Sequence, residues 1–328
     1  MSILVTGGAG YIGSHMALRL VDAGETVVVY DNLSTGNRNL VPDAATFIQA
    51  DLSDHDRLVA AIRDHSVSAI LHFAGSIIVP ESVADPLKYY RNNTALSRDL
   101  IDIAVAQGVA HFIFSSTAAV YSAVGTQPVT EEAPTGPVSP YGRSKLMTEW
   151  MLADVSAVTP LRHGVLRYFN VAGADPQGRS GHCSPDATHL IKLSCKAALG
   201  QRDHLSVYGD DFPTVDGTGV RDYIHVTDLV EAHYLLLQYL RAGGDSVTLN
   251  CGYGRGYSVR QVAQMMQEVS GVDFDIRTAP RRAGDPASIV ANSDKLKATL
   301  GWQPQHDDLR GILQNAYDWE RRLLDRSL

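Results

Sequence analysis

The strongest constraint on the fold is a set of three glycines that directly follows a short apolar segment near the start of the chain. Residues 2–6 read Ser-Ile-Leu-Val-Thr, and Gly7, Gly10 and Gly13 then form a G-x-x-G-x-x-G pattern. An apolar run that ends in glycine is typical of a buried parallel strand. Apolar residues recur at helical spacing over 11–23, which indicates a helix. The segment therefore predicts a strand, a tight turn and a helix.

The same alternation of strand and helix patterns continues along the first half of the chain. Strands that alternate with helices every few tens of residues imply right-handed βαβ units. We therefore expect an α/β fold with a doubly wound parallel sheet of the Rossmann type. Patterns typical of strands lie at 26–30, 47–50, 67–73, 111–116 and 164–168, and those typical of helices lie at 55–65, 86–107 and 141–152.

The rhythm of the sequence changes after about residue 170, where loops rich in Gly, Pro, Asp and Ser appear. We expect residues 1–170 to form the domain with the parallel sheet, with a later segment at about 215–240 returning to it. Residues 171–328 are expected to form a smaller α+β domain.

Composition excludes several classes of function. The 328 residues carry 36 Asp and Glu against 28 Lys and Arg, a formal net charge of −8. This acidic balance argues against binding to nucleic acid or an anionic membrane, which require a basic surface. The longest uncharged stretch, 103–130, contains several polar residues and indicates a buried strand and loop, not a membrane span. With three cysteines and no cationic residue before Arg19, we expect neither a disulfide framework nor a secretory signal, and we predict a cytoplasmic protein.

The glycine pattern predicts a dinucleotide site. Gly7 allows the tight turn, Gly10 lets the backbone approach a pyrophosphate, and Gly13 allows close packing of helix and strand. The helix N-terminus offers free N–H groups to the phosphates. Such a turn can also occur without a ligand, but Asp31 follows Gly13 by 18 residues at the end of the second strand. A carboxylate there binds the ribose hydroxyls, which favours NAD over NADP.

Later strand ends supply further cofactor contacts in this scheme. Asp51 and Leu52 follow the third strand, where the adenine is expected. Phe73, Ala74 and Gly75 end the fourth strand, where the nicotinamide half of the cofactor is expected to pass.

A Tyr-x-x-x-Lys pair carries the candidate chemistry. Tyr141 and Lys145 are four residues apart, so on a helix they share one face. The pair alone could be an ordinary surface contact, but the preceding strand ends in a hydroxyl residue, Thr117. Free tyrosine has a pKa of about 10, and a nearby cation together with an oxidised nicotinamide favours the phenolate. The phenolate can then take a proton from a substrate hydroxyl.

The sequence resembles the extended short-chain dehydrogenase/reductase family, and within it the nucleotide-sugar 4-epimerases that act on UDP-galactose. The resemblance spans nearly the whole chain in the order of the family. It rests on the segments VTGGAGYIGSH, DNLSTG, HFAG, YYRNN, FIFSSTAAVY, SPYGRSK, LRYFN, DGTGVRDYIHV and APRRAGDP.

The resemblance implies a homodimeric UDP-hexose 4-epimerase that interconverts UDP-galactose and UDP-glucose. NAD stays tightly bound, oxidises the sugar at C4, and returns the hydride after the 4-keto intermediate has rotated. It implies that Tyr141 is the base, Lys145 its cationic partner and a ribose ligand, and Thr117 the hydroxyl beside the sugar. It also implies cofactor contacts by Tyr11, Ile12, Asn32, Asn93 and Tyr168, and substrate contacts by Asn170, His189, Leu190, Tyr208, Arg221, Arg282 and Asp285.

The chain departs from the family pattern at a few positions. Thr117 stands where many members have Ser, Ile77 where some have Lys, and His189 where Asn is common. Ile289 occupies the position whose size admits or excludes an N-acetyl group, which leaves UDP-N-acetylhexosamines and UDP-xylose open as substrates.

Other reactions remain as alternatives. A net NAD-dependent dehydrogenase or reductase, or a binding protein, could use the same scaffold. Dehydratases of the family have acidic residues after the strand threonine, whereas this chain has Ala118 and Ala119. No metal is expected, because the His and Cys residues over 182–195 match no common zinc spacing.

Overall fold

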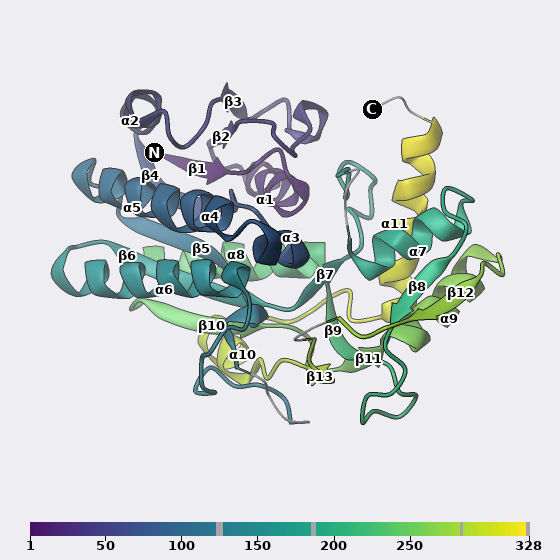
Figure 1. The fold of residues 1–328 in the computed structure, drawn as a ribbon. Coiled ribbons are helices and arrows are strands. Elements are labelled where there is room, and N and C mark those ends of the chain that lie inside the picture. The colour runs from purple at the N-terminus through teal and green to yellow at the C-terminus, as the bar shows by residue number, and fades with distance from the viewer. Residues whose placement is uncertain (123–126, 185–187, 283–284, 326–328) are drawn as a thin grey trace.

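The computed structural model describes residues 1–122, 127–184, 188–282 and 285–325. Its largest feature is a seven-stranded sheet whose neighbouring strands all run parallel, in the order β10-β6-β5-β4-β1-β2-β3 (Figure 1). The chain winds outward from β1 in both directions, which is the Rossmann order with one strand added. The strands are β1 Ser2–Thr6, β2 Val27–Asp31, β3 Thr46–Gln49, β4 Val67–His72, β5 His111–Thr117, β6 Arg162–Tyr168 and β10 Val247–Cys251.

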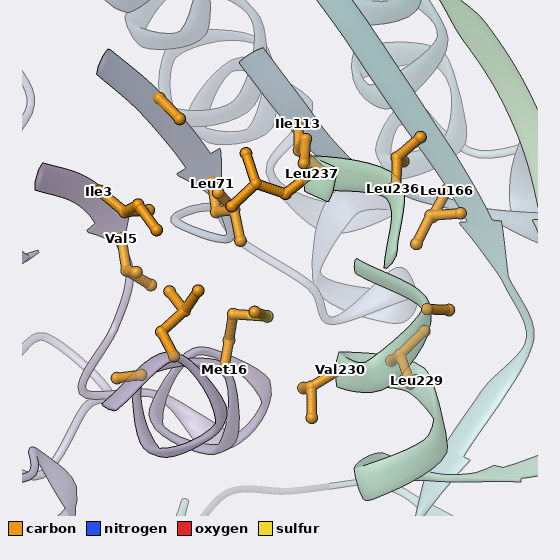
Figure 2. Packing of buried hydrophobic residues seen from close by; sticks show 14 of the residues in the cluster. Ile3, Val5, Met16, Leu71, Ile113, Leu166, Leu229, Val230, Leu236 and Leu237 are labelled. Atoms are coloured by element: carbon orange, nitrogen blue, oxygen red, sulfur yellow. The ribbon is translucent and has the colours of Figure 1, made fainter. Parts of the chain in front are cut away.

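Helices cover both faces of this sheet and confirm the predicted fold class. They are α1 Tyr11–Asp22, α2 His55–Asp64, α5 Leu96–Ala106, α6 Pro140–Val158 and α8 Val226–Arg241. Alternate strand residues point to opposite faces. Val5 therefore lies in the core cluster shared with α1 and α8, in which Figure 2 shows Leu236 of α8 beside Leu166 of β6, while Leu4 packs on the side of α2, α5 and α6.

The prediction of one regular helix over 86–107 is wrong. The structure has α4 Pro86–Tyr89, a π-helical segment η2 Tyr90–Ala95, and then α5. A π-helical turn contains more residues than an α-helical turn, so it shifts the face on which later side chains lie. Periodicity over a long window cannot detect one wide turn, which is why the sequence indicated a single helix. The segment contains the buried Asn93.

The second half of the chain adds two smaller sheets. β9 pairs with β7, β11 and β13, and β8 pairs with β12. The strands are β7 Asn170–Ala172, β8 Leu205–Tyr208, β9 Val220–His225, β11 Gly256–Ser258, β12 Ile276–Ala279 and β13 Ser288–Ile289. The remaining helices are α3 Val79–Ala84, η1 Arg38–Leu40, η3 Ala118–Val120, α7 Leu190–Ala198, α9 Val259–Ser270, α10 Asp294–Leu300 and α11 Leu309–Asp325.

Two late elements lie in the large sheet assembly, not beside the smaller sheets. β10 pairs with β6 at the edge of the large sheet, and α8 packs on its face beside α1 (Figure 1). Within the predicted return at 215–240, β9 belongs instead to a smaller sheet. A separate core forms between α7, α9 and α11. Across the residues described, no helix is both long and apolar enough to cross a membrane.

Candidate active site

The turn between β1 and α1 can be built only with glycine at two positions. Gly7 has φ +69°, and an added Cβ would lie 2.6 Å from the backbone nitrogen of Ala74. An added Cβ on Gly13 would lie 2.1 Å from the carbonyl oxygen of Gly7. No side chain caps α1 in the described structure, where Gly10 is the N-cap. The first N–H groups of the helix therefore stay available to a phosphate ligand.

Asp31 is fixed beside this turn by backbone donors. Its Oδ2 accepts a hydrogen bond from Ala9 N at 2.9 Å, and its Oδ1 accepts one from Leu33 N at 2.8 Å. The residue ends β2 and is buried. Each carboxylate oxygen keeps a lone pair for another donor. This is the arrangement that a ribose diol requires.

Asn32 and Asp51 form a second polar pair next to Asp31. Asn32 Nδ2 donates to Asp51 Oδ2 at 2.6 Å. Burial raises the pKa of Asp51, but hydrogen bonds from Ser53 and Asn32 and the charge of Arg91 outweigh burial and hold the pKa below its ordinary value. Leu52 is buried in the core beneath. With the glycine cradle and Asp31, this donor and acceptor set fits an adenine dinucleotide.

At the end of β4, residues that are predicted to contact the cofactor lie next to the candidate catalytic residues. Phe73 and Ala74 are half-buried, and Gly75 faces two polar side chains. An added Cβ on Gly75 would lie 2.9 Å from Asn93 Oδ1 and 3.7 Å from Lys145 Nζ. The strand end therefore passes directly beside the lysine.

Tyr141, Lys145 and Thr117 are brought together by α6 and β5. Helix α6 begins at Pro140, where Ser139 accepts a hydrogen bond from Gly142 N at 3.1 Å. Tyr141 lies in the first turn and shares a hydrogen bond with Thr117 at the end of β5. One turn later, the buried Lys145 Nζ donates to the carbonyl oxygen of Ser115 at 3.0 Å.

Burial is the largest influence on the pKa values of Tyr141 and Lys145. It raises the pKa of Tyr141, and the hydrogen bond with Thr117 offsets only part of that rise. It also lowers the pKa of Lys145 to about 8, against the opposing charge of Glu149. A further positive charge is needed to ionise the phenol near neutral pH, and an oxidised nicotinamide carries one.

Asn93 and Tyr168, two further predicted cofactor contacts, are hydrogen-bonded within the protein. Asn93 Oδ1 accepts from Ser76 N at 2.7 Å, and its Nδ2 donates to Ser76 O at 2.9 Å and to Ser144 Oγ at 3.0 Å. Asn93 thus ties the loop after β4 to α6. The hydroxyl of Tyr168 is hydrogen-bonded to Ser115 Oγ, and Tyr168 pairs with Thr117 in the register of β5 and β6.

A second group of predicted residues lies on the smaller sheets. Arg221 of β9 donates from Nη2 to Asp285 Oδ1 at 2.5 Å. The Arg282 guanidinium lies 3.9 Å above the ring centre of Tyr208. These residues present two arginines and an aromatic ring, which suits a nucleoside diphosphate.

Four further positions can be located around this second group. Asn170 begins β7 beside β9. His189 is the N-cap of α7, with its ring centre 5.2 Å from that of His182, and Leu190 begins the helix. Ile289 of β13 stands opposite Arg221 in the register with β9.

The remaining sequence expectations fall at the ends of helices or outside the described residues. Tyr11 and Ile12 open α1, where Tyr11 Oη donates to Gly173 O at 2.7 Å. Ile77 is 51% exposed in the loop after β4. Two residues of the APRRAGDP segment, 283–284, lie outside the described structure. Within the described structure, no group of three His, Cys, Asp or Glu residues could hold a metal ion.

Sequence reasoning missed a buried ionic pair behind the catalytic helix. Glu149 of α6 pairs with Arg167 of β6, with Nη2 2.6 Å from Oε2. The available signal was spacing, because Glu149 follows Tyr141 and Lys145 at further intervals of four residues on the same helix.

Comparison with known proteins places this site in a family. Residues 3–252 match the NAD dependent epimerase/dehydratase family. The chain is 54% identical over 321 residues to UDP-glucose 4-epimerase of Azospirillum brasilense, covering 98% of this chain and 92% of that protein.

Solved structures agree with the sequence comparison. UDP-glucose 4-epimerase from Brucella ovis in complex with NAD is 42% identical, with a TM-score of 0.94 and 97% of each chain covered. The UDP-Glc/GlcNAc 4-epimerase from Campylobacter jejuni is 46% identical, with a TM-score of 0.86 over 98% of this chain and 99% of that one. The predicted NAD cofactor and family resemblance are confirmed. The chain belongs to the NAD-dependent epimerase/dehydratase family.

Proposed function

We propose that this protein is a UDP-hexose 4-epimerase that interconverts UDP-galactose and UDP-glucose with NAD held tightly throughout the cycle. The observation that carries the proposal is the buried group of Tyr141, Thr117 and Lys145 beside the dinucleotide cradle. The relatives named UDP-glucose 4-epimerase cover nearly the full chain and support it.

Proton transfer is assigned to the residues of α6 and β5. Tyr141 as phenolate takes the proton from the C4 hydroxyl of the sugar and later returns it. Thr117, which is hydrogen-bonded to Tyr141, holds the substrate oxygen within reach of the phenol. Lys145 contributes positive charge beside this group. NAD, when bound, supplies the acceptor and donor of the hydride exchanged at C4.

Inversion requires a firm hold on the diphosphate and a weak hold on the hexose. Arg221 and Arg282 supply fixed cationic donors, since Arg221 is paired with Asp285 and Arg282 lies over Tyr208. Charge-assisted bonds from arginine to phosphate are strong and directional. The 4-keto sugar can then rotate about its link to the phosphate and present its other face to the same cofactor.

Two related activities remain as alternatives within this proposal. The Campylobacter jejuni relative is named for both UDP-Glc and GlcNAc. Here Ile289 packs against the core cluster that contains Ala118 and Phe169, so its size bears on the space near the sugar. The first alternative is therefore 4-epimerisation of another UDP-sugar, UDP-N-acetylglucosamine or UDP-xylose, and the second is a net NAD-dependent oxidation or reduction of a nucleotide sugar.

A single set of assays separates these reactions. Purified protein is expected to retain NAD and convert UDP-galactose to UDP-glucose without net formation of NADH, and parallel assays with UDP-N-acetylglucosamine and UDP-xylose define the preference. Tyr141→Phe is expected to lower kcat by about 10²- to 10⁴-fold, because the proton acceptor is lost. Tyr239→Phe on α8 is the control. Accumulation of NADH with substrate would instead favour a dehydrogenase.

The surface of η2, α5 and α6 supports a homodimer. It carries a shallow, largely apolar groove and the exposed Trp150, and the groove is lined by Tyr90, Thr94, Ala95, Arg98, Asp99, Met147 and Met151. Pairing these helices with those of a second copy would cover the groove. Sedimentation of Met151→Glu is expected to give monomers, whereas Val215→Glu, at a distant exposed position, should sediment like the wild type. A monomeric wild type would refute the dimer.

The domain division and cellular location are also proposals. We assign residues 1–170, with α8 and β10, to the NAD-binding domain and most of 171–328 to the nucleotide-sugar domain, in agreement with the sheets that these elements join. Cys183, Cys195 and Cys251 are all unpaired. Free cysteines are typical of a reducing compartment, which supports a cytoplasmic location.

A further inference from the structure

Helix α6 carries a third functional side chain that the mechanism above does not use. Tyr141, Lys145 and Glu149 follow one another at intervals of four residues, which places them along one side of the helix. Glu149 is buried, with only 6% of its side chain exposed. A buried carboxylate is costly unless it is paired and fully hydrogen-bonded. Its partners therefore indicate why it is present.

The partners of Glu149 come from the two strands beneath α6. Arg167 Nε lies 3.1 Å from each carboxylate oxygen, and its Nη2 lies 2.6 Å from Oε2. Ser116 Oγ donates to Oε1. Ser116 of β5 and Arg167 of β6 are direct neighbours in the strand register. One carboxylate thus joins α6 to two strands.

The position of Ser116 links this contact to the catalytic group. Ser116 lies between Ser115, whose carbonyl oxygen accepts from Lys145 Nζ, and Thr117, which is hydrogen-bonded to Tyr141. Ser116 reaches α6 through its side chain, Ser115 through its carbonyl oxygen and Thr117 through its hydroxyl. Movement of α6 along β5 would therefore disturb all three contacts together.

The other end of Arg167 is anchored as well. Its Nη1 donates to Tyr121 Oη at 3.1 Å, and Tyr121 Oη donates to Asn250 Oδ1 at 2.6 Å. Asn250 belongs to β10, the edge strand beside β6. The network crosses from α6 to β10 within the buried interior, so Arg167 is fixed at both ends.

Glu149 also acts on Lys145 through its charge. Lys145 is faced by Glu149 on α6, by His72 on β4, and by the ring of Phe114 on β5, 4.8 Å away. Burial lowers the pKa of His72 to about 3, so that ring is uncharged near neutral pH. Glu149 is the group that raises the pKa of Lys145 against burial.

We propose that Glu149 is a positioning residue of the active site: through Ser116 and Arg167 it fixes α6 against β5, and its negative charge keeps Lys145 cationic. The proposal rests on the proposed epimerase function. It assigns to this side chain two separable effects, one on the alignment of Tyr141 with Thr117 and one on the protonation of Lys145.

Glu149→Gln tests the charge while preserving size. A unit charge one helical turn away, at an effective dielectric constant of about 20, shifts a pKa by about one to two units. Removing the carboxylate also leaves the Arg167 cation uncompensated, and this positive charge lowers the pKa of Lys145 further. We therefore expect the alkaline limit of the kcat profile to move down by about one to two pH units and kcat at pH 7 to fall by about two- to tenfold. The KM for UDP-glucose should stay within about twofold of the wild type, and NAD should be retained.

Ser116→Ala tests alignment alone, because it removes one hydrogen bond and leaves the ion pair. It is expected to lower kcat a few-fold with KM and the alkaline limit unchanged. Glu320→Gln is the matched control, since Glu320 is equally buried and paired with Lys192, at 2.5 Å, on α7. It should lose stability without moving the alkaline limit.

The outcomes separate this proposal from the one on which it rests. A wild-type protein without 4-epimerase turnover would refute the proposed function. An active wild type whose Glu149→Gln variant keeps the same alkaline limit, or shifts it no more than Glu320→Gln does, would overturn the role of the charge. If Glu149→Gln does not fold, Ser116→Ala with wild-type kcat would overturn the positioning role.

Discussion

Substitution of Gly13 by alanine tests the cofactor cradle more directly than any change to a side chain that binds the ligand. The added Cβ would lie 2.1 Å from the carbonyl oxygen of Gly7 and 2.8 Å from the Cα of Gly8. Gly7 cannot retreat, because its N–H donates to Tyr30 O at 2.9 Å and its carbonyl accepts from Gly10 N at 3.1 Å. The N-terminus of α1 must therefore move away from β1.

That movement has a cost in packing and in binding. The buried side of α1 carries Met16 and Leu20, both fully buried against the sheet. Overpacking of this kind destabilises by about 1–3 kcal/mol. With about 2.1 cal/mol/K of unfolding entropy per residue over 328 residues, a loss of about 3 kcal/mol lowers Tm by about 4 °C. The displaced helix also withdraws its N–H groups from the pyrophosphate, so bound NAD should fall far below one per chain.

Gly24, just past the other end of α1, is the matched control. It has φ +77°, and an added Cβ meets nothing within 4 Å. Gly24→Ala should cost only the left-handed backbone, about 1–2 kcal/mol, and retain NAD. Scanning calorimetry and the absorbance of released NAD measure both effects. A Gly13→Ala protein that keeps one NAD per chain and melts within about 1 °C of the wild type would refute the steric reasoning.

Two other substitutions test specificity at opposite ends of the site. Asp31→Asn removes the charge that repels a 2′-phosphate while keeping the acceptor for Ala9 N. We therefore expect the ratio of NADP to NAD affinity, measured in cofactor-depleted protein, to rise about tenfold, which equals about 1.4 kcal/mol. An unchanged ratio would contradict the role of Asp31. Ile289→Ala should raise kcat/KM for UDP-N-acetylglucosamine relative to UDP-glucose by about tenfold, whereas Ile289→Tyr should lower it. Equal ratios in both variants would show that Ile289 does not limit the space beside the sugar.

The parts of the molecule that the sequence predicted are those governed by local patterns. The alternation of apolar strands and helices gave the correct order of the main elements through β6, because most of these strands are buried on both faces and most of the helices have one apolar side. The glycines and Asp31 could be placed because their spacing is tied to one turn. Tyr141 and Lys145 could be paired because a helix fixes which residues share a face.

The parts that escaped prediction depend on contacts between distant segments. The addition of β10 to the large sheet joins residues about 80 positions apart, and nothing in either segment specifies the partner. The π-helical segment around Asn93 is stabilised by Ser76 and Ser144, which lie on other elements. Glu149 reads as an ordinary helix surface residue until Arg167 and Ser116 are placed beneath it.

The net charge of −8 illustrates the same limit in electrostatic terms. Both ligands of the proposed reaction are anionic, so the net charge of the whole chain would predict that the protein repels them. Charges separated by more than about 8–10 Å are largely screened at physiological salt, so the local donors decide. In the proposed reaction the free N–H groups of α1 bind the cofactor phosphates, and the substrate diphosphate is bound by Arg221 and Arg282, which contact Asp285 and Tyr208. Because those two arginines are preorganised by neighbours within the fold, binding an anion requires no reversal of the global charge.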